Sequence, residues 1–195
     1  MTFKRTNPLA LAVLALLSER PMHPYEMAQT MRERHQEEVI KLNYGSLYTV
    51  VESLTRHELI TASAVQKAGN RPERTVYAVT DAGTAELHDW LRSLIAEPAK
   101  EYPRFEAGIS MVGLLPPADA LQVVSQREAA VTEQLTALAV LLEKLAGMGL
   151  PQLAWIELDY RMAVLRAERA WLSWFATATR EGTVGGYDTW EDRHR

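Results

Sequence analysis

The chain has 195 residues, a net charge of −4 at pH 7 and 47% hydrophobic residues, which is typical of a globular protein with one or two domains. It contains no cysteine, so disulfides and thiolate metal sites are excluded. The longest apolar run, residues 8–17, is shorter than a membrane span of about 20 residues and has no signal-peptide cleavage site after it. We therefore expect a cytoplasmic protein.

The charge is spread unevenly along the chain. Residues 1–80 hold 10 Lys and Arg against 8 Asp and Glu, whereas residues 81–195 hold 11 against 17. A mildly basic first part and an acidic second part suggest different roles for the two. The difference is small, so it supports nucleic-acid binding only together with the order of the predicted elements.

Three helices are predicted before residue 60. Residues 8–19 are apolar nearly all round, as in a buried helix. A second helix begins at Pro24. Its apolar side is predicted to carry Tyr25, Met27, Ala28 and Met31. A third helix runs from about Tyr44 to Glu58, with Asn43 as its N-cap.

The two faces of this third helix differ. Apolar residues recur at spacings of three and four, which places them on one face that packs on a core; they are Leu47, Val50, Val51 and Leu54. The opposite face is polar but not strongly basic, and it carries Gly45, Thr49, Glu52, Ser53 and Arg56, with Tyr48 at its margin. This second face is free to contact another molecule.

A β-hairpin is predicted next. Residues 60–66 and 75–79 are short β-branched stretches, and the basic, turn-rich segment 67–74 lies between them. Thr80 then caps a helix to about Ala96, whose core side is assigned to Leu87, Trp90, Leu91 and Leu94. Three helices followed by a hairpin are the plan of a winged helix-turn-helix, whose third helix fits a DNA major groove.

The rest of the chain is predicted to be helical, over about 104–115, 118–146 and 152–181. The middle helix has the alternating spacing of a coiled coil. The last helix carries one apolar stripe, made of Ile156, Tyr160, Ala163, Val164, Ala167, Trp171, Trp174 and Phe175. Two antiparallel helices cannot bury both stripes against each other, so a second copy of the chain is the expected partner.

We therefore expect a mainly α fold with a small β-hairpin wing, in three parts. Residues 1–97 form a winged helix-turn-helix DNA-binding domain with a connecting helix. Residues 98–182 form an antiparallel helical domain for dimerisation, which is also the candidate for binding an effector. Residues 183–195 are predicted to be a flexible tail, because this segment contains two glycines and ends in charged residues.

Several segments, in this order, resemble the PadR family of bacterial regulators. Residues 45–48, with the apolar positions that follow them, resemble the family's recognition helix. Residues 69–77 and 80–83 resemble its wing and the exit from it, and the first two helices also match. The turn at 114–117 into a heptad helix resembles the family's longer C-terminal domain, so the similarity covers about residues 8–180.

The resemblance implies a homodimeric repressor of an inverted-repeat DNA operator. Several relatives release DNA on binding a phenolic acid or a hydrophobic drug, so a small aromatic or hydrophobic effector is a candidate partner. The chain departs from the family at Glu52, where relatives often carry a basic residue, and at Glu58, where they usually have glycine at the left-handed end of the helix. Because Glu52 repels phosphates, the main positive contacts are expected elsewhere.

The residues expected to contact DNA lie at the two ends of the third helix and on the wing. Side chains at the helix start approach base edges or phosphates, and arginines on the wing approach phosphates or the minor groove. The expected set is Lys41, Tyr44, Gly45, Ser46, Tyr48, Thr49, Arg56, Lys67, Asn70, Arg71 and Arg74. The alternatives are that Tyr48 packs as a half-buried aromatic and that Arg71 is a solvated loop residue.

A second candidate site is aromatic. Trp155, Tyr160, Trp171, Trp174 and Phe175 could stack on a flat apolar effector. A helix stripe of this kind is more often core or dimer interface, and we favour that interpretation.

Two other functional classes have less support. An enzyme is not expected, because the five histidines are scattered, without HExxH spacing or a glycine-rich phosphate loop; neither a metal nor a cofactor is expected. A helical adaptor, whose winged helix contacts proteins instead of DNA, stays the alternative because the exposed face of the third helix is not basic.

Overall fold

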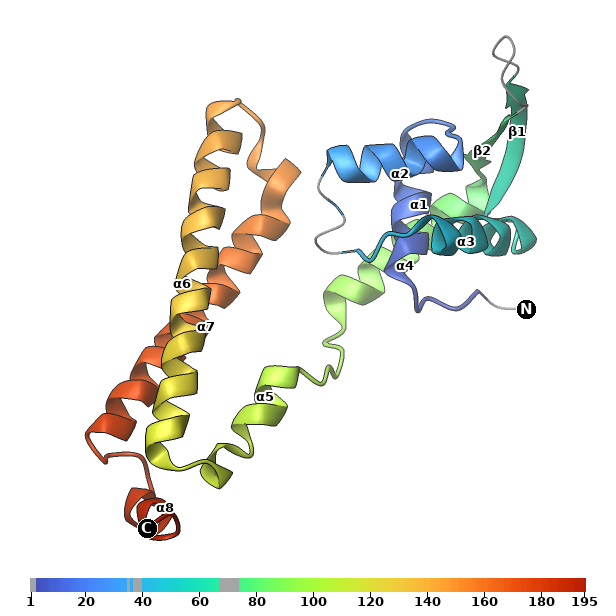
Figure 1. The fold of residues 1–195 in the computed structure, drawn as a ribbon. Helices are drawn as coiled ribbons and strands as arrows, with labels where there is room; N and C mark the ends of the chain where they lie inside the picture. Colours follow the sequence, from blue (N-terminus) through green and yellow to red (C-terminus); the bar gives the residue numbers. More distant parts are fainter. Residues whose placement is uncertain (1–2, 35, 37–39, 67–73) are drawn as a thin grey trace. The chain divides into compact units, whose positions relative to one another are not determined.

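The computed structural model describes residues 3–34, 36, 40–66 and 74–195, with the backbone alone for 64–66. The chain forms two compact units, Met1–Lys100 and Glu101–Arg195, which are coloured blue to green and green to red in Figure 1. The fold is mainly helical with a two-stranded hairpin, as predicted.

Unit 1 follows the predicted order of elements. It contains α1 (Pro8–Glu19), α2 (Pro24–Glu33), α3 (Tyr44–Arg56), β1 (Ile60–Gln66), β2 (Arg74–Val79) and α4 (Asp81–Ala96). Helix α1 packs against α3, α4 and β2, and its Val13 and Leu14 are fully buried. The nearly all-apolar sequence of α1 is explained by this central place in the core.

The hairpin is tied to the rest of unit 1 at its base. Strands β1 and β2 pair antiparallel from Ile60 and Val79 outward, with an irregularity between Ala62 and Ala64. Beside them, the backbones of Met22 and Tyr77 exchange two hydrogen bonds of 3.0 Å. The base of the hairpin is therefore fixed next to the residues that begin α2.

The start of α4 packs closely on the corner between α3 and β1. The Thr80 hydroxyl accepts from the Gly83 amide at 3.0 Å and donates to the Glu58 carbonyl at 2.8 Å, which confirms Thr80 as the cap. Leu87 and Trp90 are buried as predicted, but the assignment of Leu91 and Leu94 to the core was wrong, since they are 37% and 53% exposed. The core of unit 1 ends at Trp90, so the last turns of α4 have no part in it.

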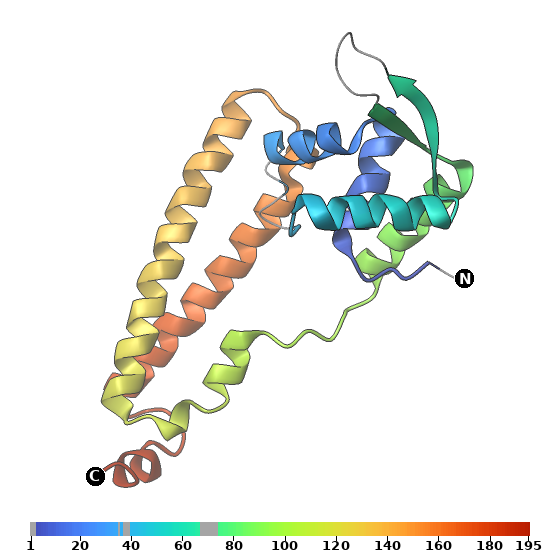
Figure 2. The ribbon, with the colours of Figure 1, turned by 45° about the vertical axis from the view of Figure 1, so that its right-hand side comes forward.

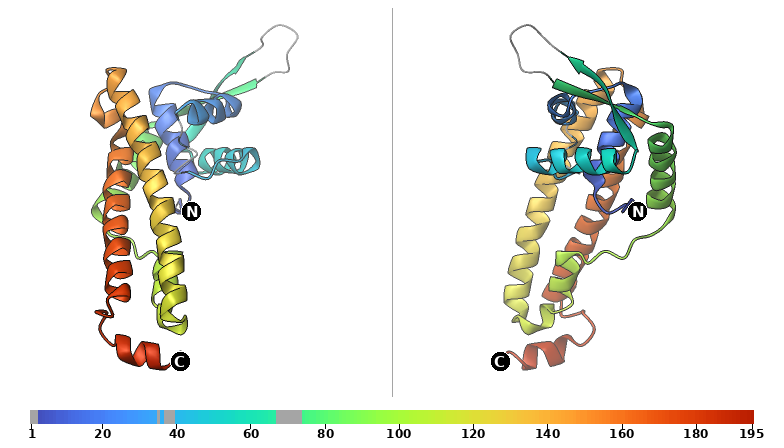
Figure 3. Two further views of the ribbon diagram at one scale, coloured as in Figure 1. Left: turned by 60° about the vertical axis from the view of Figure 1, so that its left-hand side comes forward. Right: turned by 90° about the vertical axis from the view of Figure 1, so that its right-hand side faces the viewer.

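Unit 2 is built on two long helices. It contains α5 (Arg104–Ile109), the 3-10 turn η2 (Val112–Leu114), α6 (Pro117–Gly147), the 3-10 turn η3 (Gln152–Trp155), α7 (Ile156–Arg180) and α8 (Tyr187–Asp192). Helices α6 and α7 run side by side in opposite directions (Figure 3). Val124 and Val131 of α6 and Met162 and Leu172 of α7 belong to their shared core.

The stripe predicted on α7 is only partly the face that packs on α6. Phe175 is buried, but Ile156, Tyr160, Val164 and Trp174 are 47%, 73%, 45% and 57% exposed. The core face is instead made of Met162, Leu165, Leu172, Phe175 and Ala176. Helix α7 therefore has two apolar faces, and one of them is not covered by the other elements of unit 2.

The end of the chain differs from the predicted flexible tail. Helix α8 places Trp190 in the core of unit 2 at 9% exposure. Its indole Nε1 donates to the Leu115 carbonyl at 2.8 Å, and the His194 ring lies 3.1 Å from the Gly113 carbonyl. Burial of this large aromatic residue stabilises an ordered end of the chain, although the loop before α8 is rich in glycine.

Within the described ranges, no helix has the length and apolar character needed to cross a membrane.

Candidate nucleic-acid interface

Helix α3 is seated in unit 1 by the residues predicted from its spacing. Leu47 and Leu54 are fully buried and Val51 is 2% exposed. At its start, the Asn43 side-chain oxygen accepts from the Ser46 amide at 2.7 Å, so Asn43 is the N-cap as predicted. These contacts hold the helix, drawn in cyan in Figure 2, on the core of unit 1, and the side chains of its other face are exposed.

The open face of α3 carries the residues expected to contact DNA. Tyr44 and Tyr48 are 40% and 47% exposed, and Lys41, Gly45, Thr49 and Arg56 are exposed, whereas Ser46 is half-buried. The Thr49 hydroxyl donates to the Gly45 carbonyl at 3.0 Å. Glu52 is exposed on the same helix, so the face is polar with mixed charge.

The chain just after α3 has the left-handed backbone conformation that the resemblance to the PadR family predicted. Glu58 has a φ of 59°, the one positive φ of a non-glycine residue in the described part of the chain. Glycine is favoured at such a position because it has no Cβ. A glutamate there carries backbone strain.

The wing is described only at its base. Arg74 begins β2, is exposed, and has its guanidinium carbon 6.0 Å from the centre of the Tyr25 ring. Lys67, Asn70 and Arg71 lie outside the described residues, so their DNA contacts stay predictions.

Two residues of α2, which the sequence did not predict as part of this surface, also belong to it. Tyr25 was assigned to the apolar side of the helix, but it is 51% exposed and stacks on Tyr44 with ring centres 6.2 Å apart. Arg32 donates to the Tyr44 hydroxyl at 2.8 Å, and its guanidinium carbon lies 4.8 Å from the centre of that ring. Residues 25 and 32 are two turns apart on one helix face, a spacing that could have grouped them.

His23 holds the start of α2. Its ring Nδ1 accepts from the Tyr25 amide at 3.0 Å, so the neutral imidazole is the N-cap of the helix. Burial lowers the pKa of His23, the nearby Arg74 lowers it further, and Glu26 acts in the opposite direction. The cap is therefore sensitive to protonation.

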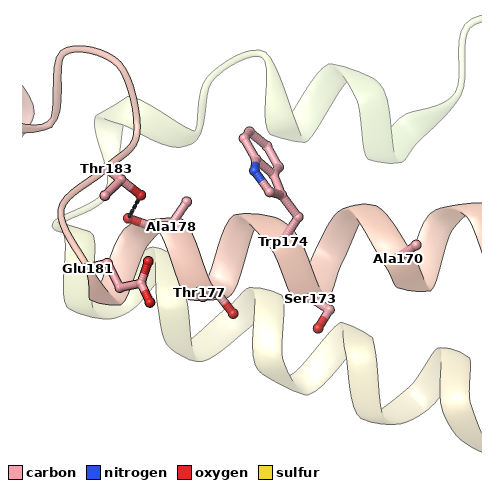
Figure 4. A pocket seen from close by; sticks show the side chains of 7 residues that line it. All are labelled: Ala170, Ser173, Trp174, Thr177, Ala178, Glu181 and Thr183. Atoms are coloured by element: carbon pink, nitrogen blue, oxygen red, sulfur yellow. Dashed lines mark hydrogen bonds between the residues drawn. The ribbon is translucent and has the colours of Figure 1, made fainter.

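The aromatic residues proposed as an effector site do not gather around one cavity. Trp171 stacks on Phe175 at 5.3 Å and lies 6.1 Å from Trp174, whereas Tyr160 is 73% exposed and Trp155 is half-buried. Of the five, only Trp174 lines the cavity of about 410 Å³ beside the end of α7 (Figure 4). The other lining residues there are small or polar: Ala170, Ser173, Thr177, Ala178, Glu181 and Thr183.

Comparison with known proteins finds a sequence similarity within the first unit. Residues 13–89 match the sequence profile of the transcriptional regulator PadR-like family. The matched stretch includes α2, α3 and the two strands of the hairpin. No curated protein matches the sequence significantly.

Solved structures share the fold of the chain beyond residues 13–89. Bacillus subtilis PadR in complex with operator DNA is 21% identical, with a TM-score of 0.73 over 89% of this chain and 99% of that one. The same protein with p-coumaric acid is 20% identical, with a TM-score of 0.69 over 88% and 95%. A PadR-like regulator from Bacillus cereus is 16% identical, with a TM-score of 0.60 over 89% and 98%.

Proposed function

We propose that this chain is a homodimeric repressor that binds an inverted-repeat DNA operator in the cytoplasm. The observation that carries the proposal is the seating of α3: one face is buried by Leu47, Val51 and Leu54, while the face with Tyr48 and Thr49 is open. A single helix with a free polar face fits a major groove. The complex of Bacillus subtilis PadR with operator DNA supports this use of the fold.

The uncovered face of α7 supports dimerisation. Ile156, Tyr160 and Val164 follow one another at a spacing of four and are each at least 45% exposed. A contiguous exposed apolar surface of this kind marks a protein–protein interface. A second copy of the chain is the simplest partner, and its two-fold axis would match an inverted repeat.

We also propose that a small aromatic or hydrophobic effector releases the DNA. The complex of Bacillus subtilis PadR with p-coumaric acid supports this. A second cavity in unit 2, of about 580 Å³, has a mainly apolar lining that includes Phe105, Ile109 and Leu115, together with Arg127. A cavity of that size and lining suits a small aromatic acid.

The test of DNA binding is a gel shift with the DNA upstream of the chain's own gene. We expect a retarded complex that is lost when Tyr48 and Thr49 are both changed to Ala, and released by p-coumaric acid if that acid resembles the effector. A folded dimer that retards no inverted repeat at low salt would favour the adaptor function.

The test of the dimer is sedimentation velocity. Tyr160→Glu with Val164→Glu places charge on the uncovered face of α7 and should yield monomers. Arg166→Glu, at an exposed position on another face of the same helix, is the matched control and should stay dimeric. Dimers of equal stability in all three proteins would contradict this interface.

A further inference from the structure

The cavity of about 580 Å³ in unit 2 is lined by residues of α5, η2 and the first half of α6. Its wall is mainly apolar and includes Ile109, Val112 and Leu115. The charged lining residues are Arg104 and Arg127, and within the described part of the chain no carboxylate lines the cavity. An apolar wall with an excess of positive charge suits an apolar anion.

Arg127 of α6 is held in place by two contacts. Its guanidinium carbon lies 3.8 Å from the centre of the Phe105 ring of α5, and its Nε donates to the Glu168 carboxylate of α7 at 2.5 Å. In the described part of the chain, its terminal Nη1 and Nη2 groups have no hydrogen-bond partner. A guanidinium presents its N–H donors in one plane, so this outer edge is oriented and can bind a carboxylate in a bidentate geometry.

The ion pair with Glu168 does not by itself account for this arrangement. The Arg127 and Glu168 side chains are 41% and 21% exposed, and ion pairs in contact with solvent contribute little to stability. Helices α6 and α7 are already joined by an apolar core that includes Val131 and Leu172. A guanidinium oriented at the wall of a cavity therefore points to a binding role.

Helix α5 is the weakly held wall of the cavity. It has no buried residue; Phe105 and Ile109 are half-buried, and the Phe105 ring meets the Trp171 ring of α7 edge to face at 6.0 Å. By contrast, the wall at Leu115 is tied to α8, because the Trp190 Nε1 donates to the Leu115 carbonyl at 2.8 Å. A short helix with few buried contacts belongs to the least stable part of a structure, so a ligand between α5 and α6 adds contacts where they are few.

We propose that Arg127 is the carboxylate-binding residue of this cavity, that its ligand is a small apolar monocarboxylic acid, and that the bound acid fixes α5 against α6. Phe105 is a positioning residue for the Arg127 guanidinium. Helix α5 is the first helix after the segment that connects α4 to unit 2, so fixing α5 also fixes the end of that segment. The inference rests on the proposed function, because it names the chemical class of the effector, the residue that selects it and the helix that responds.

Isothermal titration calorimetry of the full chain without DNA tests the anchor. The probes are cinnamic acid and octanoic acid, each compared with its own amide, which has the same apolar body without the charge. The wild type should bind at least one acid about tenfold more tightly than its amide, and Arg127→Gln should remove this preference. Arg169→Gln is the matched control, because it removes an exposed arginine of α7 that does not line the cavity, and it should keep the preference.

Two variants of Phe105 test the positioning role. Phe105→Leu keeps an apolar side chain but removes the ring under the guanidinium, so the preference for the acid over the amide should fall severalfold. Phe105→Tyr keeps the ring and should restore the preference. A structural role alone would weaken acid and amide equally in Phe105→Leu and leave their ratio unchanged.

Hydrogen exchange tests the response of α5. Peptides from residues 104–115 should gain protection when the wild type is saturated with the acid, and Arg127→Gln at the same acid concentration should not. Protection that does not change at saturation would overturn the proposed response of this helix.

Three calorimetric outcomes would overturn the anchor. One is that neither acid binds at millimolar concentration, or that acid and amide bind equally, in the wild type. Another is a preference for the acid that survives in Arg127→Gln. The last is a loss of both acid and amide in Arg127→Gln with a lower melting temperature, which would mean that Arg127 only joins α6 to α7. Because the titrations contain no DNA, a failure of DNA binding, which would overturn the proposed function, is observed separately in the gel shift.

Discussion

Gly83 is the position at which a single added methyl group should disturb unit 1 most. A Cβ built on Gly83 would lie 1.9 Å from the Leu59 carbonyl oxygen and 2.9 Å from a methyl carbon of Val79. The oxygen belongs to the main chain and cannot rotate away. Leu59 also accepts from the amide and hydroxyl of Thr80, at 3.0 and 3.1 Å, so opening the gap by roughly 1 Å breaks these hydrogen bonds too.

The expected cost of Gly83→Ala follows from these contacts. Overpacking costs about 1–3 kcal/mol, two weakened hydrogen bonds about 1 kcal/mol each, and alanine returns about 1 kcal/mol of helix propensity. The net loss in the free energy of unfolding is about 3 kcal/mol, which lowers the melting temperature of a domain this size by about 10–20 °C.

Circular dichroism melting, with hydrogen exchange of peptides from residues 1–100, measures that loss and assigns it to unit 1. Gly45→Ala is the matched control, because it also lies in the first turn of a helix and its added Cβ meets only the Asn43 oxygen at 3.7 Å. A Gly83→Ala protein that melts like Gly45→Ala would refute the reasoning.

Three further predictions concern other elements. Glu58→Gly should stabilise the chain by about 0.5–1 kcal/mol in urea unfolding, because glycine relieves the strain of the positive φ. Glu52→Gly inside α3 is the control and should destabilise the chain by about 1 kcal/mol. Changes of the same sign in the free energy of unfolding for both variants would contradict the strain at Glu58. The pKa of His23 is lowered in the folded chain, so the neutral ring's contribution to the free energy of unfolding is complete above the ordinary pKa of 6.5. That contribution is lost as the pH falls from 6.5 through the folded pKa. Urea unfolding at several pH values should therefore show a free energy of unfolding that declines over this range, and His23→Asn should reduce the decline. Trp190→Ala should lower the stability of unit 2 by about 3–5 kcal/mol, and Trp190→Phe should lower it by about half as much. Hydrogen exchange of peptides from residues 101–195 measures both losses. Protection from exchange that stays intact in Trp190→Ala would mean that α8 does not contribute to the stability of unit 2.

The sequence predicts most of unit 1 because local signals and packing agree there. The periodicity of α3, the Asn43 and Thr80 caps and the hairpin each have a strong local signature, and each is found in the structure. The prediction for Tyr25 was wrong because an aromatic residue on a helix is assigned to the core by default, while its partner Tyr44 lies 19 residues away in the sequence.

Unit 2 is harder to predict because its helices have more apolar surface than one chain buries. The stripe through Tyr160 and Trp174 is as regular as the core face through Met162 and Leu172, and periodicity alone does not distinguish them. Trp190 was missed for a different reason, because a lone aromatic in a short, charged segment has no periodic neighbours.

Selection from a library of random DNA duplexes tests the central claim most directly. The purified chain is incubated with the library, and the bound duplexes are recovered, amplified and sequenced over several rounds. We predict enrichment of one short motif present twice in inverted orientation at a constant spacing, as two-fold related copies of α3 require. Recovery of sequences no different from the starting library, by a protein shown to be folded, would contradict the account.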